Sequence, residues 1–179
     1  AIYGFSGPAI SESVLDYAES GPAAPWVTVN DVPDVPLAIL DGANARYLLV
    51  DQQNRVSPEV SAFYRHYATK LPSVDAVEEH STITINFDPE YQSVVLHSVQ
   101  LRRGDTVIDL LDLTAFDIFR EETDREKLIY NGHLQMAYVV PGVRVGDVLE
   151  YAFTLSGRNP AMGPPFFSRF QQQYSGPVQ

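Results

Sequence analysis

Apolar and polar residues alternate along most of the chain from residue 46 onward. The clearest case is the stretch 80–87, in which Ile83, Ile85 and Phe87 alternate with threonine and asparagine residues. Successive side chains of a β-strand point to opposite faces of the sheet, so this pattern predicts strands that bury one face. The predicted strands are 46–56, 61–71, 80–87, 91–103, 106–111, 133–140, 147–155 and 167–174.

Turn-forming residues separate the predicted strands about every 8–15 residues. They include the pairs Ser57-Pro58, Asp88-Pro89, Pro141-Gly142 and Asn159-Pro160. The stretch 112–130 is ambiguous, because apolar residues at i, i+3 and i+6 permit a helical turn or two. Since strands do not alternate with long helices, we predict a mainly β chain, an antiparallel β-sandwich with at most one or two short helices.

The predicted strand 61–71 carries aromatic side chains on both of its faces. Tyr64 shares one face with His66, whereas Phe63 and Tyr67 lie on the other. This arrangement is typical of a strand that is covered on both sides or that bears an additional segment.

The first 45 residues differ from the rest of the chain because they hold five of the 13 prolines. Proline fixes φ and donates no backbone hydrogen bond, so this region is predicted to be mostly extended or looped. We therefore predict two parts, an extended N-terminal arm or linker over 1–45 that packs on the body, and a β-sandwich domain over 46–179.

One short helix is predicted within the arm, over 11–20. Ser11 is placed to cap the helix and Gly21-Pro22 to end it. The helix would bury Val14 and Leu15, with Ala18 as a further candidate.

Composition and charge exclude several classes of protein. The chain has 179 residues, of which 45% are hydrophobic, so it is predicted to be globular and not disordered. Its net charge is −11 and no basic stripe is present, which disfavours nucleic-acid binding. Apolar runs such as 37–40 are far shorter than a membrane-spanning helix requires. The first residues do not have the sequence pattern of a signal peptide, so we expect that a signal peptide has been removed or that this is part of a longer protein.

The chain contains no cysteine. This excludes disulfides, thiolate zinc sites and a cysteine nucleophile within it. No G-x-S-x-G motif and no glycine-rich phosphate loop occur either. We therefore predict no catalytic, cofactor-binding or metal-binding residues.

Three local patterns have both a structural and a functional interpretation. The tripeptide Arg103-Gly104-Asp105 matches an adhesion motif, but a hairpin turn is the better interpretation. The region around this tripeptide contains four acidic residues, namely Asp105, Asp109, Asp112 and Asp117. Their spacing is not that of an EF-hand, so we interpret them as a solvated acidic face and leave calcium binding open. The four histidines lie on different predicted segments, and we interpret them as half-buried strand residues. They are His66, His80, His97 and His133.

Several short stretches, in order, resemble one bacterial family. They are PWV (25–27), NFDPEYQ (86–92), RGDTVID (103–109), LIYNG (128–132), VRVGDVLEY (143–151), RNP (158–160) and GPV (176–178). Together they resemble the domain of unknown function that stands immediately before a transglutaminase-like domain in bacterial envelope proteins. The resemblance covers about residues 25–178.

The resemblance implies a β-rich, non-enzymatic module that is exported to the periplasm or cell surface. It also implies a Cys-His-Asp set in the domain that follows, and none of that set can be transferred to this cysteine-free chain. The residues of VRVGDVLEY fit this structural role. Asp147 is placed to satisfy turn amides, and Leu149, Tyr151, Phe153 and Leu155 are predicted to face the core.

Three functions compete at this point. The first is an accessory module that supports or positions the transglutaminase-like domain, with an apolar docking surface near Phe166, Phe167 and Phe170. The second is a glycan- or peptide-binding module with an exposed aromatic face. The third is a hydrolase, which requires two acids, or an acid and a histidine, in one cleft.

Overall fold

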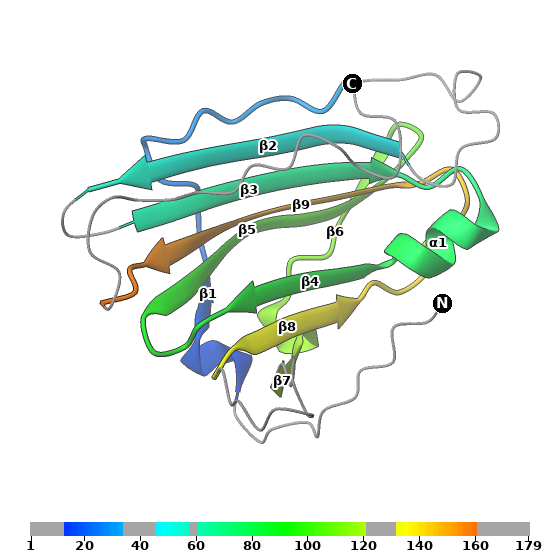
Figure 1. Ribbon diagram of the computed structural model, residues 1–179. Helices are drawn as coiled ribbons and strands as arrows, with labels where there is room; N and C mark the ends of the chain where they lie inside the picture. The colour runs from blue at the N-terminus through cyan, green and yellow to red at the C-terminus, as the bar shows by residue number, and fades with distance from the viewer. Residues whose placement is uncertain (1–12, 34–45, 58–60, 121–131, 161–179) are drawn as a thin grey trace.

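The computed structural model describes residues 13–33, 46–57, 61–120 and 132–160, which form two β-sheets packed face to face (Figure 1). The larger sheet has the strand order β1-β5-β9-β3-β2, with β6 also paired to β5, and the smaller has the order β4-β8-β7. The larger sheet consists of β1 (Ala18–Ser20), β2 (Arg46–Val56), β3 (Ser61–Lys70), β5 (Gln92–Arg103), β6 (Thr106–Asp109) and β9 (Val148–Gly157). The smaller sheet consists of β4 (Thr82–Phe87), β7 (Asp117–Arg120) and β8 (Leu134–Val139). The predicted β-sandwich is confirmed.

The pairing between the described strands is antiparallel except at β1, which runs parallel to β5. The core lies between the two sheets and is filled by the apolar side of each alternating strand. In β4 the buried residues are Ile83, Ile85 and Phe87, as the pattern predicted. Leu149 and Phe153 of β9 also belong to this core, and Tyr151 and Leu155 pack against it.

The central strand β9 is buried on both faces, whereas β3 is buried on one face and mostly half-buried on the other, where Phe63, Arg65 and Tyr67 lie. On the side of β9 that points away from the smaller sheet, Glu150, Ala152 and Thr154 are all buried, and Tyr64 and His66 of β3 share this side. Of the two interpretations of the aromatic pattern in 61–71, full burial on both sides is not met, because only one face of β3 is fully buried. We call this side of the larger sheet the outer face.

Residues 21–33 lie against the outer face and continue alongside β2 (Figure 1). Val32 in this segment packs against a small apolar cluster of Leu48, Ala68 and Val148. The predicted arm boundary at residue 45 lies outside the described residues, and so does the predicted strand 167–174.

The helix predicted over 11–20 is wrong. The described part contains only a 3-10 turn, η1 (Val14–Asp16), capped by Ser13, and Ala18–Ser20 forms β1 instead. The edge of β5 competes for this backbone, because Val94 N–H donates to Tyr17 O and Gly21 N–H donates to Leu96 O, both at 3.1 Å. A short isolated helix is marginal, so pairing with an existing strand is the more stable outcome.

One α-helix, α1 (Val74–His80), lies in a stretch left unassigned by the sequence pattern. Its N-cap is Ser73, whose hydroxyl accepts a hydrogen bond from Ala76 N–H at 3.1 Å. His80, predicted to start a strand, ends this helix. The ambiguous 112–130 stretch contains a second 3-10 turn, η3 (Leu113–Ala115), followed by β7.

Candidate functional site

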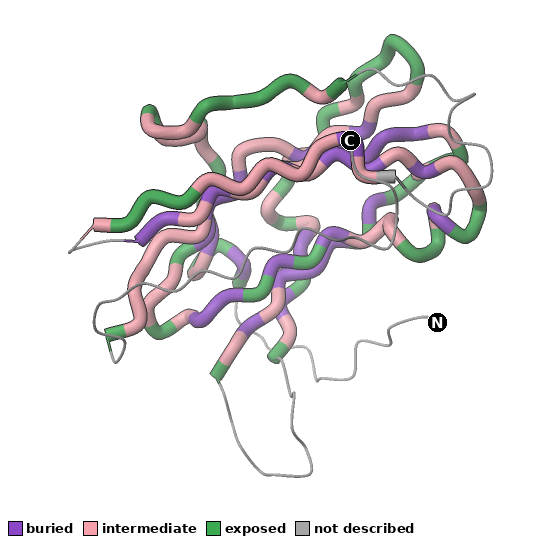
Figure 2. Tube along the Cα trace, turned by 45° about the horizontal axis from the view of Figure 1, so that its top comes forward, coloured by how far each residue is buried: buried purple, intermediate pink, exposed green. Residues whose placement is uncertain are grey.

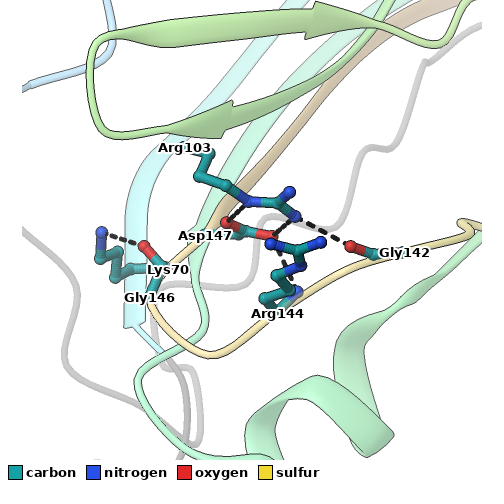
Figure 3. Close-up of polar contacts among 6 residues, drawn as sticks. All are labelled: Lys70, Arg103, Gly142, Arg144, Gly146 and Asp147. Carbon is teal, nitrogen blue, oxygen red and sulfur yellow. Dashed lines mark hydrogen bonds and ion pairs between the residues drawn. The ribbon is translucent and has the colours of Figure 1, made fainter.

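A buried carboxylate holds the turn between β8 and β9 (Figure 3). Asp147 is 1% exposed and accepts hydrogen bonds from Arg103 Nε at 2.9 Å and Nη2 at 2.7 Å. It also accepts one from Arg144 N–H at 2.7 Å, while Arg103 Nη2 donates to Gly142 O at 2.8 Å. Burial acts to raise the pKa of Asp147, but these hydrogen bonds and the arginine charges hold it below its usual value.

The same turn is tied to the end of β3. Lys70 Nζ donates to Gly146 O at 2.5 Å (Figure 3). Gly146 N–H donates to Leu71 O at 2.7 Å. Leu71 N–H in turn donates to Asp147 O at 2.9 Å. The centre of the VRVGDVLEY motif is therefore a clamp that joins three parts of the fold. The prediction that Asp147 satisfies a turn amide is confirmed.

Arg103-Gly104-Asp105 forms the turn between β5 and β6, with Gly104 at a φ of 56°. The hairpin interpretation of this tripeptide is confirmed. The Arg103 guanidinium binds Asp147 within the fold, so its charge serves the clamp.

A second buried carboxylate, Glu150, lies on the outer face between two basic groups. His66 Nε2 lies 2.9 Å from its Oε1, and Arg102 Nε donates to its Oε2 at 2.5 Å. Burial acts to raise the pKa of Glu150, but hydrogen bonds from His66 and Arg102 keep it below its usual value. This grouping could not be predicted from the sequence, because 84 positions separate His66 from Glu150 and only the alignment of β3 with β9 brings them together.

His66 and Glu150 bring together the acid and histidine that a hydrolase would require. Their side chains are only 5% and 7% exposed, and the second oxygen of Glu150 is occupied by Arg102. His66 Nδ1 is buried, and no hydrogen-bond partner of it is found, so no hydroxyl nucleophile contacts it among the described residues. The arrangement is structural. The Glu150 carboxylate is buried away from water, and its contacts with His66 and Arg102 compensate for the lost hydration.

His97 connects the arm to the centre of the outer face. Its Nδ1 lies 2.8 Å from Gly21 O, which can only accept, so Nδ1 carries the proton and Nε2 accepts from Thr154 Oγ1 at 2.7 Å. The ring also stacks on Tyr64 at 5.7 Å between centroids. Burial lowers the pKa of His97, and the hydrogen bond to Gly21 opposes this only in part.

Two of the short motifs meet where β9 ends. Gly157 pairs with Gln92, and its φ is 144°. A Cβ at this position would lie 1.7 Å from Tyr91 O, so only glycine fits. Asn159 Nδ2 donates to Tyr91 Oη at 3.4 Å. NFDPEYQ and RNP thus form one packed junction at the end of the sandwich.

Two of the acidic residues near the hairpin accept hydrogen bonds from backbone N–H groups two positions further along the chain. Asp109 accepts a hydrogen bond from Leu111 N–H at 3.1 Å, and Asp112 caps η3 by accepting from Thr114 N–H at 2.9 Å. Within the described residues, no three His, Asp or Glu side chains are grouped closely enough to hold a metal ion. No described helix is long and apolar enough to cross a bilayer.

The described aromatic residues are all buried or half-buried. Phe116 and Tyr138 pack at 5.1 Å in the core, and Tyr67 packs on Tyr151 at 5.4 Å. The exposed aromatic face that a glycan-binding module requires is therefore not found among these residues. The docking residues Phe166, Phe167 and Phe170 lie outside the described part of the chain.

Comparison with family models gives one match, over residues 60–179, to a domain of unknown function with a solved structure, DUF3857. The chain belongs to the DUF3857 family. This confirms the resemblance to a domain of unknown function that the short motifs indicated. No curated protein matches this DUF3857 chain.

Among solved structures, the chain is similar to a putative protease from Parabacteroides distasonis. The TM-score is 0.57 and the identity 19%, over 64% of this chain. At this identity the likeness shows a shared fold. The match spans 23% of the Parabacteroides protein, so this chain corresponds to less than a quarter of that protein's length.

Proposed function

We propose that this DUF3857 chain is a non-catalytic accessory module of an exported bacterial protein. It supports and positions a transglutaminase-like, cysteine-protease-like domain in the same polypeptide. The observation that carries the proposal is the likeness to 23% of a longer protein described as a putative protease. A shared fold does not by itself establish a function, so the residues of the site must also be consistent with the proposed role.

The buried charges support the structural role. Asp147 and Glu150 each bind an arginine of β5, and each joins segments that are distant in sequence. Such pairs orient strands and turns, whereas a catalytic acid must reach a substrate. The motif residues thus build a rigid body on which a neighbouring domain can be held.

The proposal is tested on the full-length protein. Its coding sequence should continue into a domain with a cysteine, a histidine and an aspartate, and replacing that cysteine should abolish turnover. Removing the DUF3857 domain should leave the cysteine intact but lower the thermal stability or turnover of the remaining domain. A coding sequence without such a domain would contradict the proposal, and so would a remaining domain that is unchanged in both properties.

A further inference from the structure

Residues 28–32 follow the outer side of β2 in an extended course with alternating contacts. Thr28, Asn30 and Val32 contact the sheet, whereas Val29 is 64% exposed and Asp31 is also exposed. Figure 2 shows this stretch as an exposed tube beside the larger sheet. The period of two is that of a strand, yet side chains of β2 make the polar contacts.

Gln53 binds the backbone of Thr28 in the manner of a neighbouring strand. Thr28 N–H donates to Gln53 Oε1 at 2.9 Å, and Gln53 Nε2 donates to Thr28 O at 2.6 Å. Gln53 Nε2 also donates to Asp51 Oδ2 at 2.9 Å, which fixes the orientation of the amide. This contact accepts any residue that has a backbone N–H, so it excludes only proline.

The next two contacts select side chains. Asn30 Nδ2 donates to Asp51 Oδ2 at 2.9 Å, so an aspartate at this position would place two carboxylates together. Val32 packs against Leu48, Ala68 and Val148, which form an apolar socket for a small side chain. Backbone recognition combined with alternate side-chain selection is how proteins bind extended peptides.

We propose that the outer side of β2 is a peptide-binding site, filled in this chain by its own residues 28–32. The ligand class is an extended peptide with an asparagine at its centre and a small apolar residue two positions later. The occupying segment is exposed over residues 28–31, so it is held by few contacts. The inference is independent of the proposed accessory role.

The chain offers an intrinsic probe, because Trp26 is its only tryptophan and lies half-buried two residues before Thr28. A synthetic peptide VTVNDVP, which copies residues 27–33 without the tryptophan, should displace the segment and shift Trp26 emission to longer wavelength. A tethered segment competes at an effective concentration on the order of 1 mM, so the titration must reach the millimolar range.

A second measurement removes this competition. In the variant N30A/V32A the segment is weakened, so the labelled peptide should bind about tenfold more tightly than to the unmodified protein, as fluorescence anisotropy reports. A peptide with aspartate in place of asparagine should bind about tenfold more weakly. Gln53→Ala introduced into N30A/V32A should abolish binding.

The matched control is Gln52→Ala in the same background, which changes the same residue type on the opposite face of β2 and should leave peptide affinity unchanged. The proposal is overturned if N30A/V32A, shown to be folded by circular dichroism, does not bind the peptide. It is also overturned if Gln53→Ala and Gln52→Ala have equal effects on binding.

Discussion

Arg102 and Arg103 are neighbours on β5, and each binds one of the two buried acids of the 143–151 motif. Arg103 holds Asp147 in the turn, and Arg102 holds Glu150 on the outer face. A buried carboxylate that loses its partner keeps the full cost of desolvation. At the scale of single residues, these two pairs are expected to be the most sensitive polar positions in the fold.

Asp147→Asn should lower the free energy of unfolding by about 3 kcal/mol, because it removes the charge that binds Arg103 while the side chain stays buried. Chemical denaturation of the purified chain measures this. The control is Asp105→Asn in the exposed hairpin turn, which should leave the denaturation midpoint unchanged. Equal effects of the two substitutions would show that Asp147 is not the clamp.

Folding stability should fall as the pH drops below about 6.5, because burial lowers the pKa of His97 from its usual 6.5. Below pH 6.5 the unfolded chain binds a proton at His97 that the folded chain binds less readily. The free energy of unfolding therefore decreases from pH 6.5 down to the lowered pKa of His97. Denaturation midpoints measured between about pH 7.5 and about pH 5 test this. His97→Gln should flatten the dependence in this window, and an unchanged slope would contradict it.

A further loss of stability is expected in acid. The pKa values of Glu150 and Asp147 lie below their usual 4.5 and 3.8. Above these usual values, the two carboxylates make their full contribution to folding stability. It is lost as the pH falls through the lowered pKa values. In the same titration, Glu150→Gln should reduce the slope below about pH 4.5 while leaving the His97 window in place. A slope in acid as steep as that of the unmodified chain would contradict this.

Little of the residue-scale chemistry could be predicted from the sequence. The turn role of Asp147 followed from Gly146-Asp147, because turn chemistry is local. The pairing of His66 with Glu150 depends on the alignment of β3 with β9, which only the folded sheet establishes. The sequence predicted an arm that packs on the body, but the pattern of β9 does not reveal that residues 21–33 lie against its outer face.

At the scale of elements, the long strands could be predicted and the short elements could not. The stretches 46–56 and 61–71 match β2 and β3 within one residue, because long runs without glycine or proline, separated by the turn signal Ser57-Pro58, are a strong signal. The helix predicted over 11–20 is too short to be stable in isolation, and pairing with the open edge of β5 makes Ala18–Ser20 a strand instead. α1 has seven residues and a single capping serine, which is a weak signal in isolation.

The 3-10 turn that replaces the predicted helix can be tested by two adjacent substitutions. Val14→Ala should lower the free energy of unfolding by about 2 kcal/mol, because Val14 is 6% exposed within the core. Leu15→Ala should have no measurable effect, because Leu15 is 60% exposed. Denaturation curves of the two variants give the comparison, and a larger effect of Leu15→Ala would favour the original helix.

The junction at the end of β9 depends on the absence of a side chain. Gly157→Ala should lower the free energy of unfolding by about 4 kcal/mol, because its Cβ would meet Tyr91 O at 1.7 Å. Gly104→Ala is the matched control, since Gly104 also has a positive φ but no atom lies within 4 Å of its Cβ. It should cost about 1 kcal/mol. Similar losses for both would mean that backbone strain alone is at work.

At the scale of the whole molecule, the chain is a sandwich whose outer face is lined by its own N-terminal segment. The core between the sheets includes Val14 and Ala18, so the first part of this segment belongs to the fold. The buried acids Glu150 and Asp147 form ion pairs with arginines, one on the outer face and one at a turn. This organisation suits a body that holds a neighbouring domain.

The central claim is that catalysis belongs to another part of the polypeptide. The most direct test is the turnover number of the full-length protein with Glu150→Gln in the DUF3857 domain, compared with replacement of the cysteine of the proposed transglutaminase-like domain. Measured below the unfolding temperature of each variant, Glu150→Gln should retain turnover within about twofold, since loss of a working acid or base costs about a hundredfold or more. The cysteine replacement should abolish turnover. Loss of turnover in folded Glu150→Gln, with activity surviving the cysteine replacement, would contradict the account.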